Sequence, residues 1–267
     1  MNPPPSGPRV PIQWDVEQYH KFHGERSRPF FDLLARIPDR SYGVILDLGC
    51  GSGELTAALG EHWPEARVAG IDQSDEMLAP ARTREVVGRL EFRNGDIAEW
   101  RPAKPVDLVV SNSAFQWIPD QPALLKHVLS YLAPEGVLAV QLPDNFGSPS
   151  HTLLDEVESS GPWSHKLRGR RNHDGILPLS RYVELLWSEG MSVDAWSMEY
   201  QQVLPGDDAV LEWMKGTALR PILTELDDGE RRDFLSAYGE KLRAAYPKSE
   251  SGTLFPFRRL FFVAVKR

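Results

Sequence analysis

Cysteine and long apolar runs are nearly absent from this sequence of 267 residues. The single cysteine, Cys50, cannot form an internal disulfide or a thiolate-rich metal site. No stretch approaches the roughly 18 consecutive apolar residues of a membrane-spanning helix, and the first residues contain no apolar region of the signal-peptide type. These absences favour a reducing compartment, and we expect a cytoplasmic protein.

Positive charge is also in short supply. The chain has 30 lysines and arginines against 38 aspartates and glutamates, which gives a formal net charge of −8. This sign disfavours a protein that tracks phosphate backbones. Apolar residues make up 41% and charged residues 25%, as in ordinary globular proteins. We therefore expect a compact fold with a small-molecule substrate, no nucleic-acid or membrane partner, and a monomeric or small homo-oligomeric state.

The N-terminal segment differs in composition from the rest of the chain. Prolines are dense in residues 1–13, which favours an extended, frayed tail, and order is expected from Trp14. Apolar residues between Tyr19 and Ile37 have helical spacing, and Pro29 interrupts them. Two short helices are predicted there, with Pro29 opening the second.

Strand and helix patterns alternate through the next hundred residues. Helices are expected at 54–63, after Ser74 and at 123–132, with Pro80 kinking or shortening the second of them. Short apolar runs predict strands at 44–48, 68–72, 90–92, 107–110 and 136–142. Strands separated by helices are typical of an α/β protein with a parallel sheet and right-handed crossovers.

The remaining chain predicts a helical cover and two late strands. Helices and loops are expected over about 145–255, interrupted by a strand at 193–204, and the last strand is expected at 258–266. We interpret residues 14–267 as one domain, with its core at 40–142.

Glycines follow the first predicted strand at alternate positions. The segment 47–53 reads Asp-Leu-Gly-Cys-Gly-Ser-Gly and precedes a helix. Glycine allows close approach of a backbone to a ligand, and a helix start presents unpaired N–H groups. The pattern is typical of a nucleotide cradle, although a tight turn without a ligand also explains it.

Acidic residues end the two strands that follow. Asp72 is placed to accept hydrogen bonds from two ribose hydroxyls, and Asp96 is placed to accept from an adenine amino group while Ile97 packs on the ring. A solvated aspartate at a strand end is the alternative for Asp72. Together, the three strand ends predict a site for one adenosine.

The glycine spacing distinguishes between adenosine cofactors. Dinucleotide sites use G-x-G-x-x-G, whereas this chain has G-x-G-x-G preceded by Asp47. A carboxylate at that position repels a pyrophosphate but attracts the ammonium group of a methionine moiety. The chemistry favours S-adenosylmethionine over NAD.

Residues 40–142 resemble the class I S-adenosylmethionine-dependent methyltransferases, whose first motif reads D-x-G-x-G-x-G. The resemblance implies a Rossmann-like sandwich with a mostly parallel seven-stranded sheet, and a transfer site lined by residues 111–117. The D/N-P-P-Y/F signature of amino-group methyltransferases is absent, which argues against amide or nucleobase acceptors. The cofactor residues that it implies are Tyr19, Arg28, Asp47, Gly49, Cys50, Gly51, Gly53, Asp72, Gln73, Met77, Asp96, Ile97 and Asn112.

Nearly the whole chain is similar to the trans-aconitate 2-methyltransferases. The similar blocks include residues 25–29, 116–117, 143–145, 219–221 and 257–261. Ala218 departs from the family pattern, which often has glycine before Leu-Arg-Pro. The resemblance implies a monomethyl ester of a tricarboxylic acid as product. The acceptor-side residues that we expect are Gln116, Trp117, Gln141, Asn145, Trp213, Arg220 and Arg259, and the resemblance favours the two arginines. Plain packing is the alternative for Trp117 and Trp213.

The acceptor chemistry requires no catalytic base and no metal. A carboxylate with a pKa near ~4 is already anionic at neutral pH, so catalysis means alignment and removal of water. Arginine forks suit the carboxylates that do not react, and the candidate forks are Arg28, Arg220 and Arg259. Lesser candidates are Lys166, Arg168, Arg170, Arg171 and Lys215, and a surface ion pair is the alternative for each of these cations. Arg28 could instead bind the carboxylate of the cofactor. His20 and His23 lie three residues apart but have no evident third metal ligand.

Three rival functions remain open at this point. A methyltransferase of the same fold could act on another small acid or on a hydroxyl group. A non-catalytic protein could bind S-adenosylmethionine and signal through its helical cover. An NAD-dependent dehydrogenase ranks last, because the glycine spacing does not fit a dinucleotide.

Overall fold

The computed structural model describes residues 23–168 and 175–267. The predicted tail and the residues Trp14, Tyr19 and His20 lie outside these ranges. No helix within the described residues is long and apolar enough to cross a membrane.

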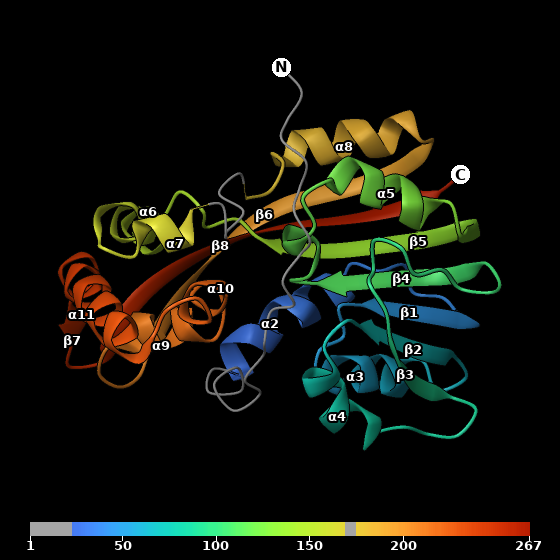
Figure 1. The fold of residues 1–267 in the computed structure, drawn as a ribbon. Helices are drawn as coiled ribbons and strands as arrows, with labels where there is room; N and C mark the ends of the chain where they lie inside the picture. The colour runs from blue at the N-terminus through green and yellow to red at the C-terminus, as the bar shows by residue number, and fades with distance from the viewer. Residues whose placement is uncertain (1–22, 169–174) are drawn as a thin grey trace.

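A single mixed sheet forms the centre of the molecule (Figure 1). Its main path has the order β3-β2-β1-β4-β5-β8-β6, and the short strand β7 pairs with β8. Strands β1 to β5 are parallel, whereas β8 runs antiparallel to both β5 and β6. This confirms the predicted α/β fold with a mostly parallel sheet. The strands are β1 Val44–Leu48, β2 Arg67–Asp72, β3 Leu90–Asn94, β4 Val106–Asn112, β5 Leu132–Pro143, β6 Met191–Leu204, β7 Lys248–Ser249 and β8 Gly252–Lys266.

Helices cover both faces of the sheet and give three layers (Figure 1). On one face, α5 and α8 pack against the sheet through buried residues that include Leu124 and Tyr182. On the other face, α2 and α3 pack against it through buried residues that include Leu33 and Leu59. The helices are α2 His23–Leu34, α3 Glu54–His62, α4 Asp75–Arg82, α5 Gln121–Leu129, α6 Pro149–Ser160, α7 Ser164–Leu167, α8 Leu179–Ser188, α9 Ala209–Lys215, α10 Arg220–Leu223 and α11 Asp228–Ala245, with a 3-10 turn η1 at Phe115–Trp117.

The prediction that Pro29 opens a new helix is wrong, because α2 runs through it without a break. A proline inside a helix removes a hydrogen bond and costs about 3 kcal/mol. Phe30 and Leu33 follow directly and are almost fully buried in the core. Burial of these two side chains offsets the lost bond, so tertiary packing overrides the local signal.

Helix α4 follows its predicted start more closely. The side chain of Ser74 accepts a hydrogen bond from the N–H of Met77 at 3.2 Å, as an N-cap does. The helix is only eight residues long and includes Pro80 near its end. Met77, Leu78 and Ala81 are its buried residues, and Met77 faces the glycine turn.

Strands β6 and β8 continue well beyond the end of β5. Pairing of β5 with β8 stops at Pro143 and Arg259, while β6 and β8 remain paired as far as Leu204 and Thr253. Helices α6, α7, α9, α10 and α11 gather around this extension (Figure 1). We call these helices and the extended strand ends the cap. It has a hydrophobic core of its own, which includes Trp213, Phe234 and Phe255.

Candidate active site

The carboxyl ends of β1, β2, β3 and β4 meet at one edge of the sheet. These strands are parallel neighbours, and Asp72 pairs in register with Asn94, the last residue of β3. In open α/β sheets, ligands bind outside the carboxyl ends of the strands. The structure therefore brings the three predicted acid and glycine segments to the same edge.

The turn after β1 depends on glycine for reasons internal to the protein. Gly49 and Gly53 have φ values of 80° and 78°, in the left-handed region that favours glycine. A Cβ on Gly49 would lie 2.2 Å from the Cβ of Ala114, and one on Gly53 would lie 2.6 Å from the Phe92 ring. Both glycines are therefore required by packing inside the protein, Gly53 against β3 and Gly49 against the segment after β4, whether or not a ligand approaches the turn.

Asp72 holds the turn in place from the neighbouring strand. One carboxylate oxygen accepts from the N–H of Gly51 at 2.9 Å, and the other accepts from the N–H of Ser74 at 2.9 Å. Burial raises the pKa of Asp72, and these backbone hydrogen bonds oppose that shift. Each oxygen keeps a second lone pair, so the carboxylate can still accept from ribose hydroxyls. Gln73 beside it is exposed, and its carbonyl accepts from the side chain of Asn94 at 3.2 Å.

Asp47 lies beneath the glycine turn and is 3% exposed. Its carboxylate accepts a hydrogen bond from the hydroxyl of Thr56 at 2.6 Å. Burial raises the pKa of Asp47 to about 7, and the nearby charge of Asp72 adds to the shift. The reasoning from sequence missed Thr56, although a hydroxyl residue in the first turn of the helix after the glycines was a usable signal.

The other predicted cofactor residues surround this turn. The side chain of Asp96 accepts from the N–H of Ala98 at 2.9 Å, while Ile97 and Met77 are buried apolar neighbours. Cys50 is a buried free thiol, and burial raises its pKa, which makes it unsuited to act as a nucleophile. The Oδ1 atom of Asn112 is buried and has no hydrogen-bond partner within the described residues. Such an atom suits a ligand that carries a donor, such as an ammonium group.

Four polar side chains on the acceptor side form one connected group. Nη1 of Arg259 donates to the Ser113 hydroxyl and to Oε1 of Gln141, each at 3.2 Å. The Ser113 hydroxyl donates to the same Oε1 at 2.9 Å, and Nε2 of Gln116 donates to the carbonyl of Ser113 at 2.6 Å. We call Ser113, Gln116, Gln141 and Arg259 the polar cluster. Ser113 was missed as a site residue, although it lies within the predicted transfer segment.

Aromatic side chains connect this cluster to the cap. The guanidinium of Arg259 lies 4.4 Å from the centroid of the Phe257 ring, and that ring lies 5.4 Å from Trp213. The guanidinium of Arg26, in α2, lies 4.4 Å from the centroid of the Trp213 ring, and the same side chain donates to the carbonyl of Trp213 at 3.3 Å. Arg26 is 8% exposed and Arg259 is 3% exposed. The site thus has two buried arginines, of which only Arg259 was predicted to bind the acceptor.

The other predicted residues are less buried or make other contacts. Arg220 begins α10, and burial lowers its pKa. Trp117 is half-buried in η1. The side chain of Arg28 is 71% exposed and lies 3.9 Å from Asp32.

Two of the lesser cations, Lys166 and Lys215, form ion pairs. Lys166 pairs with Glu230 and Lys215 pairs with Glu212, each at 2.6 Å, which agrees with the alternative that they are surface ion pairs. Of the other cations in that run, Arg170 and Arg171 lie outside the described residues.

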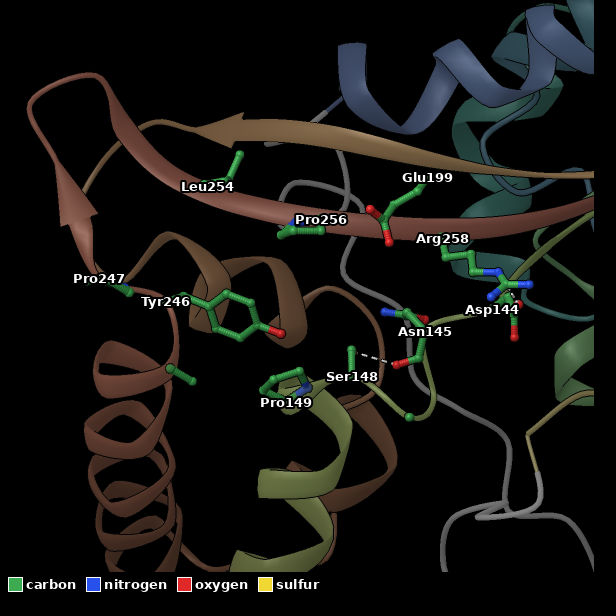
Figure 2. Close-up of a pocket in the computed structure, with 12 residues that line it drawn as sticks. Asp144, Asn145, Ser148, Pro149, Glu199, Tyr246, Pro247, Leu254, Pro256 and Arg258 are labelled. Carbon is green, nitrogen blue, oxygen red and sulfur yellow. Dashed lines mark hydrogen bonds and ion pairs between the residues drawn. The ribbon is translucent and has the colours of Figure 1, made fainter.

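Asn145 lines a separate cavity of about 720 Å³ (Figure 2). Arg258 also lines it and lies 2.9 Å from the carboxylate of Asp144. Successive residues of a strand face opposite ways, so Arg258 and Arg259 belong to different faces of β8. The lining has two carboxylates, Asp144 and Glu199, and one arginine, Arg258. Because the carboxylates would repel an anionic ligand, this cavity is a poor site for a polycarboxylate. The structure therefore groups Asn145 with Arg258 rather than with Arg259.

Among the described residues, no group of three His, Cys, Asp or Glu side chains could hold a metal ion. His20 lies outside these residues.

Comparison with known proteins agrees with this geometry. A family model described as a methyltransferase domain matches residues 22–185. The trans-aconitate 2-methyltransferase of Streptomyces avermitilis is 45% identical over 266 residues, covering 97% of this chain and 99% of that protein. The enzyme of the same name from an Azoarcus species is 44% identical over 254 residues, covering 95% and 99%. The chain belongs to the trans-aconitate 2-methyltransferase family.

Solved structures agree with the family at the level of the fold. Protein YcgJ of Bacillus subtilis matches with a TM-score of 0.56 and 15% identity, over 89% of this chain and 97% of that one. Phosphoethanolamine N-methyltransferase 2 of Haemonchus contortus matches with a TM-score of 0.57 and 18% identity, over 94% and 56%. The fold and the family together identify the chain as a methyltransferase.

Proposed function

We propose that this methyltransferase uses S-adenosylmethionine to esterify one carboxylate of trans-aconitate, giving a monomethyl ester. The relatives that share 40% to 45% of its residues carry the name of that activity. The observation that carries the proposal is the polar cluster, where the buried Arg259 and Gln141 lie beside the last residue of β4. A buried guanidinium beside a buried amide suits an anionic acceptor.

The glycine turn and its neighbours are suited to hold the cofactor. Asp72 has lone pairs for the ribose, Asp96 can accept from the adenine amino group, and Ile97 and Met77 supply apolar surface for the ring. Asp47 and Oδ1 of Asn112 are acceptors for the ammonium group. When bound, S-adenosylmethionine supplies a methyl group on a positively charged sulfur, which a carboxylate oxygen attacks directly.

The task of the protein in this reaction is alignment. The acceptor carboxylate is ionised at neutral pH, so no side chain needs to remove a proton. Attack neutralises charge, and strong binding of the reacting carboxylate would therefore slow it. We expect Arg259, assisted by Arg220, to bind the carboxylates that do not react. The apolar side chains of the cap would exclude water from the reacting groups.

Methyl transfer from radiolabelled S-adenosylmethionine tests this function. The purified protein is given trans-aconitate, cis-aconitate, citrate, a monocarboxylate and a small hydroxyl compound in parallel reactions. We expect the highest kcat/KM with trans-aconitate, and a base-labile ester as product. Strong turnover of the monocarboxylate or the hydroxyl compound, with none of trans-aconitate, would contradict the proposal. Cofactor binding without turnover of any acceptor would favour the non-catalytic alternative.

A further inference from the structure

Ser113 is central to the polar cluster, and its backbone conformation is unusual. Its φ value is 57°, in the left-handed region that non-glycine residues rarely adopt. Its N–H donates to the carbonyl of Gln141 at 3.0 Å, and its own carbonyl accepts from Gln116 at 2.6 Å. Backbone strain of this kind is found where the surrounding structure holds a residue in place, often at functional sites.

The hydroxyl of Ser113 determines the direction of the hydrogen bonds around it. Arginine can only donate, so Oγ of Ser113 accepts from Arg259 and gives its single proton to Oε1 of Gln141. Oε1 of Gln141 also receives a hydrogen bond from Arg259. The amide of Gln141 thus has only one orientation that satisfies both donors.

That orientation leaves a buried donor available to a ligand. Gln141 is 0% exposed, and its Nε2 atom has no hydrogen-bond partner within the described residues. An unsatisfied buried donor destabilises the protein, and a bound acceptor atom would satisfy it. The guanidinium of Arg259 lies beside this amide, so the two side chains together suit a carboxylate.

Two neighbouring atoms have the opposite character. Oδ1 of Asn112 and Oε1 of Gln116 are buried acceptors without partners in the described part of the chain. The orientation of Gln116 is determined by its bond to the Ser113 carbonyl. The end of β4, the turn η1 and strand β5 therefore present one buried amide donor and two buried acceptors that have no partner among the described residues. The donor suits a carboxylate of the acceptor, and the two acceptor atoms suit a donor group of a ligand, such as the ammonium group of the cofactor in the proposed function.

We propose that Ser113 is the positioning residue of the acceptor site. Its hydroxyl orients Gln141 and Arg259 so that the Gln141 amide and the guanidinium bind one carboxylate of the acceptor. The inference depends on the proposed function for its ligand, a small polycarboxylate. Ser113 acts through these two side chains and needs no contact with the acceptor.

Ser113→Gly is the informative change, because glycine adopts positive φ without strain and the substitution removes only the hydroxymethyl group. Loss of the two hydrogen bonds is expected to raise the KM for trans-aconitate about 10- to 30-fold, with a smaller change in kcat. Calorimetry should give an S-adenosylhomocysteine affinity within about threefold of the wild type. Glu135→Gly is the matched control, since Glu135 also has positive φ, at 60°, and its side chain is 83% exposed.

A double-mutant cycle with Gln141→Leu separates positioning from a general structural effect. If Ser113 acts through Gln141, the double variant should bind the acceptor about as weakly as Gln141→Leu alone. Effects that add in full, or equal weakening of acceptor and S-adenosylhomocysteine, would overturn the positioning role. An unchanged KM in Ser113→Gly would overturn it as well.

Calorimetry of trans-aconitate with the S-adenosylhomocysteine complex makes the inference independent of turnover. Binding without methylation would contradict the proposed function but still allow Ser113→Gly to be compared with the wild type. If the wild type methylates trans-aconitate and Ser113→Gly has an unchanged KM for it, this inference alone would be contradicted. If the wild type binds none of the acids in the panel, there is no acid site and the inference is wrong.

Discussion

The two halves of the site are assembled in different ways. On the cofactor side, Asp47, Thr56, Asp72 and Asp96 come from consecutive β-α units, and each segment contacts its neighbour in the chain. On the acceptor side, Ser113 contacts Arg259 across 146 positions, and Arg26 contacts Trp213 across 187. Local motifs build the first half, whereas long-range strand pairing builds the second. Mutations should therefore separate cofactor binding from acceptor binding.

The largest expected effect concerns stability on the cofactor side. The pKa of Asp47 is raised by burial from 3.8 to about 7, so the unfolded chain loses this proton at lower pH than the folded protein does. The free energy of unfolding should then fall as pH rises from about 4 to about 7 and stay level above. Asp47→Asn keeps an acceptor for the Thr56 hydroxyl but has no proton to lose, so its free energy of unfolding should not show this fall. Relative to the wild type, the free energy of unfolding of the variant should therefore be higher at pH 8 than at low pH by up to about 4 kcal/mol.

Urea denaturation of both proteins at pH 5 and pH 8 measures this difference. Asp233→Asn, on the exposed side of α11, is the control and should behave like the wild type at both pH values. A gain for Asp47→Asn that is the same at both pH values would exclude titration of Asp47 as its cause.

Asp72→Ala should cause the next largest effect, and this effect should be on cofactor binding. The variant loses the carboxylate predicted to bind the ribose, which also accepts from the N–H of Gly51 in the glycine turn and from the N–H of Ser74 before α4. We expect S-adenosylhomocysteine affinity to fall about 100-fold by calorimetry, or about 3 kcal/mol, since hydrogen bonds to charged groups are worth about 1.5 to 3 kcal/mol. The exposed Asp75→Ala serves as control. Unchanged affinity in Asp72→Ala would refute the adenosine site.

Arg259→Met should affect binding on the acceptor side. Loss of the buried guanidinium is expected to raise the KM for trans-aconitate about 30-fold, while the affinity for S-adenosylhomocysteine changes less than about threefold. Arg258→Met is a close control, because the adjacent residue faces the other side of β8 and pairs with Asp144. Equal effects of the two substitutions would mean that Arg259 is structural.

The smallest effect is expected at Asn145, which lines the cavity on the Arg258 side. Asn145→Ala should change the KM for trans-aconitate by less than about threefold, because no acceptor group is placed there. Steady-state kinetics beside Arg259→Met gives the comparison. A KM increase as large as that of Arg259→Met would extend the acceptor site into this cavity.

Prediction from sequence succeeded where neighbours in the chain determine the structure. The strand and helix pattern, the Ser74 cap and the approach of Asp72 to the glycine turn all follow from short segments with clear periodicity or turn chemistry. It failed at Pro29, where burial of Phe30 and Leu33 outweighs a local helix breaker. It also missed Arg26 and Ser113, whose polar contacts appear only after packing. Thr56 was missed as well, although its place in the first turn after the glycines was a usable signal.

The amino-acid sequence by itself determined the α/β class, the glycine turn and the acid that supports it, because these depend on backbone sterics and on contacts between adjacent units. The family resemblance named Arg259, but only the tertiary structure decided that this arginine, and not Arg258, lies in the polar cluster. That choice depends on the register of β8 against β5 and β6, where a shift of one residue would exchange the two faces. The hydrogen-bond direction around Ser113 likewise exists only once three distant segments meet.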